Sequence, residues 1–342
     1  MSSPSFLNLP KLIQKLLVFL AVMILGTYCI FLTRASVNPS LPGLGEPPAL
    51  YSNQSQQDLR LTFVEAIRQA KQSVHLVMFG LSDAAILNAL SRRLQDRLPL
   101  SVYYDAGESP RVRSQLRGAD LHPVRLAGLM HQKILILDRD LVFIGSANMT
   151  ESSLRMHDNL VVGMRNQKMA QFLLERIPSS SGYLRTMVGG QDVELWLLPD
   201  PRGVALSDLR RMLRKASRSI KIALFTITHP SLCEEVIAAQ EKGIDVTLVV
   251  DLHSGLGASS KAVEQLRQKG VKVLYSQGVQ LLHHKFVWID EEILICGSAN
   301  WTKAAFKKNS DCILALHHLT PDQKEFMRCL WHRIESEARK IE

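Results

Sequence analysis

The chain has 342 residues, a formal net charge of +9 and a pI near 9.4. With 46% hydrophobic and 21% charged residues, it is not a disordered or low-complexity chain, and it can bury one large or two ordinary cores. The basic balance favours an anionic partner: a phospholipid surface, a nucleic acid or another phosphoester. Its five cysteines form no CxxC pair and no zinc-ligand spacing, so no zinc site of the zinc-finger type is expected.

The first predicted element is an uncharged apolar run at residues 16–32, which follows Lys11 and Lys15. As a helix it would rise about 26 Å, close to the roughly 30 Å of a bilayer's hydrocarbon core. The sequence therefore predicts a single-pass signal anchor over residues 1–34, with the N-terminus inside and the remaining chain on the outer, periplasmic or extracellular, face. The alternative is a cleaved signal peptide and a secreted protein, although no clear small-x-small site closely follows the run.

Residues 35–50 contain four prolines and two glycines and are predicted to be a linker. Beyond them the chain repeats itself, with helices and strands alternating in two halves, residues 51–180 and 190–342. The segment 177–190 is expected to join the halves. Helices are predicted from residue 58, at 84–94, from residue 208, at 231–243 and at 259–270; strands are predicted at 73–81, 220–228 and 271–276 and in the runs that end at Asp105 and Asp251.

These strands are rich in Val, Ile and Leu, which is typical of sheets that are covered on both faces. The predicted fold class is therefore α/β, with two pseudo-symmetric halves packed into one body.

One short motif occurs once in each half. A histidine and a lysine are separated by one residue, an aspartate follows five residues after the lysine, and the tetrapeptide GSAN comes next. The first copy consists of His131, Lys133, Asp138 and residues 145–148, and the second consists of His283, Lys285, Asp290 and residues 297–300. Every residue of the second copy lies 152 positions after its counterpart, so chance is a poor explanation.

The spacing within the motif has a structural consequence. The apolar residues 134–137 and 286–289 are predicted to be strand cores, and residues two apart on a strand point to one face. If the halves pack with pseudo-symmetry, two imidazoles and two ammonium groups converge. Such a site suits attack at phosphorus, because lysine and asparagine bind the non-bridging oxygens. An imidazole serves there as nucleophile or general acid near neutral pH.

From about residue 55 to 320, the paired HxKxxxxD and GSxN pattern resembles the phospholipase D superfamily. The resemblance implies a two-lobed α/β sandwich, catalysis with no metal and no other cofactor, and a single active site formed within one chain. It also implies that His131 is the nucleophile and His283 the general acid/base. The phosphate-binding residues would be Lys133, Lys285, Asn148 and Asn300, supported by Ser146 and Ser298.

In that superfamily an acidic residue further along the chain orients each histidine, usually a glutamate in an N-x-E context. The matching positions here are Asp158 and Asp311, although Met156 replaces the asparagine of the first. Asp138 and Asp290 complete the catalytic motif and are expected to tie its strand to a neighbouring element.

The leading functional hypothesis is hydrolysis or transfer of phospholipid headgroups through a phospho-histidine, with a phospholipid membrane as partner. It rests on the predicted anchor and on the apolar residues that precede each histidine, Leu129-Met130 and Leu281-Leu282. One alternative is a metal-independent endonuclease with a nucleic-acid substrate. A second is a non-catalytic, membrane-tethered binding protein. Both motifs lie in one chain, so a monomeric active site is expected.

Overall fold

The computed structural model describes residues 10–37, 39–178 and 181–341, which form two compact units, Met1–Ser40 and Leu41–Glu342. The first unit contains one helix, α1 (Lys11–Val37), and its side chains are described at residues 11 and 13–26. Within the described residues, no helix has both the length and the hydropathy needed to cross a membrane. The predicted span at 16–32 extends past the described side chains, and the N-terminal anchor stays a prediction.

The first half of the larger unit is built on a seven-stranded sheet with the order β1-β8-β6-β5-β2-β3-β4. β2 pairs in parallel with β3 and antiparallel with β5, so the motif strand β5 lies at the centre of the sheet. The strands are β1 (Ala49–Tyr51), β2 (Val74–Met78), β3 (Leu100–Asp105), β4 (Asp120–Val124), β5 (Lys133–Leu137), β6 (Leu141–Gly145) and β8 (Val161–Arg165).

The second half has a nine-stranded sheet with the order β18-β13-β12-β11-β15-β16-β17-β10-β9, and its motif strand β15 is also central. Its strands are β9 (Gly182–Val188), β10 (Gln191–Leu197), β11 (Ser219–Leu224), β12 (Asp245–Asp251), β13 (Lys272–Ser276), β15 (Lys285–Ile289), β16 (Ile293–Gly297), β17 (Cys312–His317) and β18 (Ala338–Arg339). A two-stranded parallel sheet joins the halves, formed by β7 (His157–Asp158) and β14 (Leu281–Leu282).

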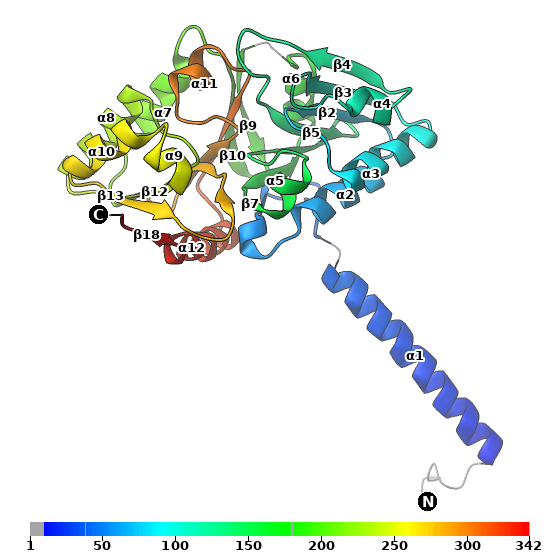
Figure 1. Cartoon of the computed structure of the whole chain (residues 1–342). Helices are drawn as coiled ribbons and strands as arrows, with labels where there is room; N and C mark the ends of the chain where they lie inside the picture. The colour runs from blue at the N-terminus through cyan, green and yellow to red at the C-terminus, as the bar shows by residue number, and fades with distance from the viewer. Residues whose placement is uncertain (1–9, 38, 179–180, 342) are drawn as a thin grey trace, which may run out of the picture. The chain divides into compact units, whose positions relative to one another are not determined.

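Amphipathic helices cover the outer face of each sheet. Asp58 and Asp83 cap the N-termini of α2 and α3, whose apolar sides pack on the first sheet. These helices are α2 (Leu59–Gln69) and α3 (Ala84–Gln95); the second sheet is covered by α7 (Val204–Arg214), α8 (Pro230–Glu241) and α10 (Ser260–Gln268). Figure 1 shows the two sheets in the middle of the body, with α2 and α3 on one side and α7, α8 and α10 on the other.

Further helices complete the two halves. Of these, α6 and α12 contribute apolar side chains to the core that the two halves share. The remaining helices are η2 (Asn53–Ser55), α4 (Val112–Gln115), α5 (Glu151–Arg155), α6 (Gln167–Leu174), α9 (Leu252–Leu256), α11 (Lys303–Lys307) and α12 (Pro321–Ser336).

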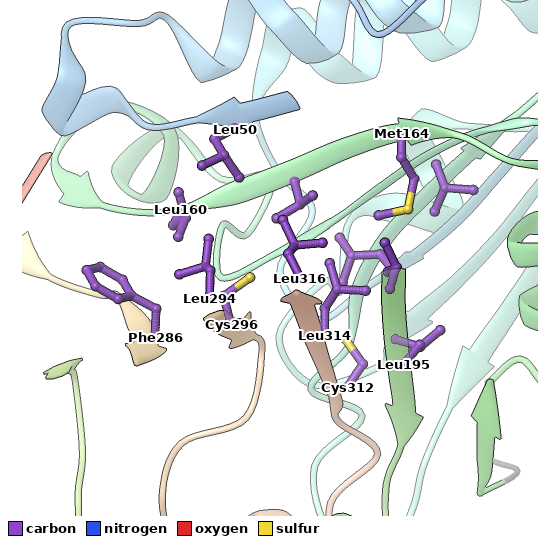
Figure 2. Close-up of a cluster of buried hydrophobic side chains, with 14 of the residues drawn as sticks. Leu50, Leu160, Met164, Leu195, Phe286, Leu294, Cys296, Cys312, Leu314 and Leu316 are labelled. Atoms are coloured by element: carbon purple, nitrogen blue, oxygen red, sulfur yellow. The ribbon is translucent and has the colours of Figure 1, made fainter. Parts of the chain in front are cut away.

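The uncovered faces of the two sheets bury one another. Figure 2 shows Leu160 and Met164 of the first half facing Leu294 and Leu314 of the second, all of them buried. Each sheet is thus covered on both faces, which explains why its strands lack the polar alternation of a half-exposed sheet. The result is an α/β/β/α sandwich of two similar halves, and the α/β fold class predicted from the sequence is confirmed.

Both segments that were predicted to be linkers contain strand residues. Within 177–190, Gly182–Val188 forms the edge strand β9, which pairs along its whole length with β10. Within 35–50, the last two residues belong to β1, and the carbonyl of Pro42 accepts a hydrogen bond of 3.0 Å from Nε of Arg165. Proline, glycine and serine reduce the local preference for a strand, but pairing with a neighbouring strand supplies hydrogen bonds that local composition does not reveal.

Candidate active site

The two motif histidines lie just before β5 and β15, where each half pairs with the other. The backbone N–H of His131 donates to the carbonyl of Ser310 at 2.7 Å, and that of His283 donates to the carbonyl of Asp158 at 3.0 Å. Each histidine is therefore held in place by a residue of the opposite half. The site exists only when the two halves are packed together.

The imidazole rings are also held across the halves. Nδ1 of His131 lies 2.8 Å from Oδ1 of Asp311, and Nδ1 of His283 lies 2.9 Å from Oδ1 of Asn159. All four residues are buried. One histidine thus has a carboxylate as its partner and the other has a neutral amide, which breaks the pseudo-symmetry at the point where chemistry is expected.

These contacts determine which ring nitrogen carries the proton. The Asp311 carboxylate only accepts, so Nδ1 of His131 is the donor. The amide nitrogen of Asn159 donates to the carbonyls of Ser153 (2.8 Å) and His157 (2.9 Å), so its oxygen faces His283 and accepts. In both neutral rings Nε2 therefore carries the lone pair, as a nucleophile or base requires.

The structure places Asn159, and not Asp158, against His283. Consecutive strand residues face opposite sides, and Asp158 lies on the far side of β7 within electrostatic range of Glu337 and Arg333. Burial, and then Glu337, raises the pKa of Asp158 to about 7. The sequence did contain the signal, because Asn159 and Asp311 differ by the same 152 positions as the motif residues.

The two serines of the GSAN segments have a different position from the one expected of phosphate ligands. The hydroxyl of Ser146 donates to Oδ1 of Asn159 at 2.9 Å, and that of Ser298 donates to Oδ1 of Asp311 at 2.7 Å. Both serines are buried. Their hydroxyls fix the residues that orient the histidines, so direct phosphate binding by Ser146 and Ser298 does not fit this geometry.

The asparagines of the same segments are half-buried. Oδ1 of Asn148 accepts a hydrogen bond from the N–H of Gly80 at 3.3 Å. Oδ1 of Asn300 is buried and has no partner among the described residues. Amide groups held at the histidine ends of the motif strands remain candidates for contact with a phosphate.

Both motif lysines are buried beside their histidines. Nζ of Lys133 donates to the carbonyl of His131 at 2.6 Å, and Nζ of Lys285 donates to the carbonyl of His283 at 2.9 Å. Burial lowers the pKa of Lys133 to about 7, and burial followed by the charge of Lys133 lowers that of Lys285 well below its ordinary value. An anion bound between the lysines would favour their charged forms.

Two phenylalanines that sequence reasoning did not single out form walls of the site. The ring centroid of Phe79 lies 5.1 Å from that of His131 and 5.0 Å from Nζ of Lys133. Phe225 lies 5.3 Å from both His283 and Nζ of Lys285. Each follows the strand next to its motif strand, β2 or β11. This equivalent placement in the two halves was the signal by which the sequence could have identified them.

The electrostatic surroundings favour the neutral form of both histidines. Burial lowers the pKa of His131 and Lys133 adds to this, although Asp311 opposes it. Burial, and then Lys285 and Lys133, lower the pKa of His283 well below its ordinary value. Burial alone would raise the pKa of Asp311, but His131, Lys133 and Ser298 hold it below the usual range, so this carboxylate is ionised.

The last residues of the motif, Asp138 and Asp290, lie at the opposite end of the strands from the histidines. The Asp138 carboxylate accepts the backbone N–H groups of residues 71–73, and the Asp290 carboxylate accepts those of residues 217–219. Both have left-handed backbones, with φ of 53° and 54°. They tie the motif strands to the segments before β2 and β11, as the sequence suggested, and do not reach the site.

Replacing Asp290 with alanine is expected to lower the free energy of unfolding by about 1–3 kcal/mol, because three backbone donors lose a charged acceptor. Asp290→Asn should lose less, since it keeps one acceptor oxygen and tolerates a left-handed backbone. Thermal unfolding followed by circular dichroism measures both. A fall in turnover with unchanged stability would instead show that Asp290 acts in the chemistry.

In the described part of the chain, no group of three or more His, Cys, Asp or Glu side chains could hold a metal ion.

Comparison with known proteins places the chain in a family. A model described as the PLD-like domain of cardiolipin synthase matches residues 63–178 and 209–332, which together exceed half of the chain. The chain belongs to this family. Both matched segments contain one copy of the motif, and the family lies within the phospholipase D superfamily that the sequence resembles.

The similar curated proteins are partial matches. Mitochondrial cardiolipin hydrolase of Xenopus tropicalis is 33% identical over 138 residues, 38% of this chain and 63% of that protein. The protein of the same name from Homo sapiens is 30% identical over 165 residues, 46% of this chain and 63% of that protein. The chain therefore spans less than two thirds of the length of these relatives.

Among solved structures, phosphatidylserine synthase from Haemophilus influenzae superposes with a TM-score of 0.69 at 14% identity. The match covers 90% of this chain and 91% of the other. At this identity it establishes a shared fold, with two sheet-containing halves in one chain.

Proposed function

We propose that the protein is a membrane-associated phosphodiesterase of phospholipids that works through a phospho-histidine intermediate, with water or an alcohol as the final acceptor. The observation that carries the proposal is the pair of buried histidines with both Nδ1 atoms bound across the halves. This leaves the two Nε2 atoms to do chemistry beside two lysines. Family membership and the lipid substrates in the names of the relatives support it.

In the first step, Nε2 of His131 attacks phosphorus and the bond to the leaving alcohol breaks. The proton on Nε2 of protonated His283 moves to the leaving oxygen, so a neutral alcohol departs. In the second step, His283 takes a proton from water or an acceptor alcohol, whose oxygen attacks phosphorus. The phosphorus–nitrogen bond breaks, its electron pair returns to His131, and both imidazoles regain their starting forms.

The different partners of the two histidines support this assignment of roles. Phosphorylation leaves the ring of His131 positively charged, and the ionised Asp311 at Nδ1 stabilises that charge. His283 has only the neutral Asn159, so its protonated form is a stronger acid and gives up its proton more readily. A bound anionic phosphate offsets the positive charges of Lys133 and Lys285, which lower the pKa of His283. Binding therefore favours protonation of His283 in the complex.

The phosphate ligands in this proposal are Lys133, Lys285, Asn148 and Asn300. The ammonium and amide groups donate to non-bridging oxygens as charge develops. Phe79 and Phe225 exclude water from the same region, which strengthens those interactions.

The N-terminal unit is proposed to attach the enzyme to a membrane, with the N-terminus inside. In the described part of α1, the side chains of Leu16, Phe19, Leu20 and Ile24 are each more than half exposed. Apolar side chains exposed along a helix are stabilised when lipid covers them. The relatives named as mitochondrial cardiolipin hydrolases agree with a membrane substrate.

The proposed function is tested with the full chain in chelator, against phospholipid vesicles containing a primary alcohol and against labelled single-stranded DNA and RNA. Headgroup release together with phosphatidyl-alcohol is expected, and both should vanish in His131→Ala. Cleavage of nucleic acid alone would replace the lipid assignment with a nuclease using the same two histidines. Absence of turnover on every substrate would leave a binding protein.

A further inference from the structure

Exposed apolar side chains gather around the active site. In the described part of Leu41–Glu342, nine large apolar side chains are exposed, and five of them lie near the motif histidines, four on loops and one at the end of helix α9. These five, here called the apolar rim, are Leu126 (37% exposed), Leu129 (47%), Met156 (56%), Leu256 (58%) and Val279 (107%). Isolated exposed leucines are ordinary, but several on neighbouring loops mark a contact surface.

The backbone ties two residues of the rim to the catalytic groups. Leu129 lies two residues before His131, and its carbonyl accepts the N–H of Ser310 at 2.8 Å. The carbonyl of Met156 accepts the N–H of Leu281 at 3.2 Å, two residues before His283. The rim therefore draws on loops of both halves.

Val279 and Leu256 extend the rim on the side of His283. Val279 precedes β14, and the neighbouring side chain of Gln280 donates to the carbonyl of Arg155 at 3.4 Å. Leu256 ends α9, which starts directly after Asp251, and Asp251 lies within electrostatic range of Lys285.

Within the segments that carry four of the rim residues, and in the segment after the second GSAN, the charged side chains have one sign. No Asp or Glu occurs in residues 125–130, 155–157, 277–282 or 302–309. The cations of these segments are Arg125, Arg155, Lys303, Lys307 and Lys308. All five cations are exposed. Arg155 has an ion pair with Glu151 at 3.5 Å, but both side chains are more than half exposed, so this pair leaves most of the positive field in place.

We propose that the apolar rim and its five cations form a docking surface for the headgroup layer of an anionic bilayer. This inference rests on the proposed function and adds the partner surface. Apolar side chains enter the boundary between headgroups and acyl chains, while the cations meet lipid phosphates. Docking in this way brings the phosphodiester of a lipid toward the site without extracting the lipid from the membrane.

The same residues fit a nucleic acid less well. Binding of single strands relies on aromatic side chains that stack with bases, and the rim contains leucine, methionine and valine only. Exposed aliphatic side chains gain nothing from a phosphate backbone, whereas they gain from an acyl layer.

Penetration is measured without turnover by placing a tryptophan in the rim. In the full chain, Val279→Trp should lose fluorescence in phosphatidylglycerol vesicles whose acyl chains are brominated, compared with unbrominated vesicles. The four native tryptophans are buried, so they contribute little quenching. Met187→Trp on the edge strand β9 is the control and should not be quenched. Equal quenching, or none, in the two variants would overturn the docking surface.

The effect of docking on turnover is tested with a matched pair of substitutions, at Met156 and Met187, since both side chains are 56% exposed. Met156→Glu should lose about tenfold on long-chain lipid in vesicles and keep its activity on a short-chain phospholipid dissolved as monomer. Met187→Glu should keep both. Equal loss on monomer and vesicle would indicate local damage instead of docking. If the wild-type chain hydrolyses neither lipid, the proposed function fails, and the fluorescence result still decides whether the rim enters a bilayer.

Discussion

His131→Ala is expected to lose turnover by a factor on the order of 10⁴ or more, because it removes the nucleophile. His283→Ala should lose about 10²–10⁴-fold on natural lipids, the range for a missing general acid. The two variants should differ on a phosphodiester of p-nitrophenol, since that leaving group departs without a proton. A burst of p-nitrophenolate is expected in His283→Ala and not in His131→Ala, measured by stopped-flow absorbance.

The burst should match a covalent product. Rapid acid-free quenching and mass spectrometry should find the phosphoryl group on His131 in His283→Ala, at up to one group per chain. Asp290→Asn is the control for protein preparation and quenching, because the side chain of residue 290 lies at the far end of β15 from the site. A burst confined to His131→Ala, with the label on His283, would reverse the two roles.

Much of the site could be predicted because its signal was repeated. The histidine and lysine positions follow from two motif copies with one offset, and strand periodicity predicts that they share a face. The same rule would have identified Asn159 as the counterpart of Asp311. Alignment with the N-x-E pattern of the superfamily places the assignment one residue too early, at Asp158, and on a strand one residue reverses the face.

Other parts depend on contacts that sequence periodicity does not encode. Each catalytic histidine is oriented by a residue of the opposite half, and this follows from how the two sheets pack. The roles of Ser146 and Ser298 follow from the same arrangement, because their hydroxyls bind these orienting residues. β9 was missed for a related reason: its hydrogen bonds come from β10, and its exposed edge leaves the local sequence free to be polar. Helices and central strands were easier because their apolar residues repeat with a fixed period.

Exchanging the two orienting residues should separate their effects. Asp311→Asn is expected to lower kcat on the order of 10²-fold, because a neutral amide no longer stabilises the positive ring of phosphorylated His131. Asn159→Asp should have a smaller effect on kcat, because it supplies a charge where the first step needs none. Equal losses in the two variants would contradict an asymmetric pair.

The pH profile of kcat/KM on a soluble phosphodiester gives the sharper measurement, because it reports the free enzyme. The first step needs His131 neutral and His283 protonated, and both pKa values are lowered. The wild-type optimum should therefore lie on the acid side of an ordinary histidine's titration. The pKa of His283 is the more strongly lowered of the two, so His283 sets the acid limb and His131 the alkaline limb. In Asn159→Asp the added carboxylate raises the pKa of His283, so the acid limb should move to higher pH while the alkaline limb stays. Unchanged limbs would mean that Asn159 does not govern the titration of His283, which would contradict an asymmetric pair.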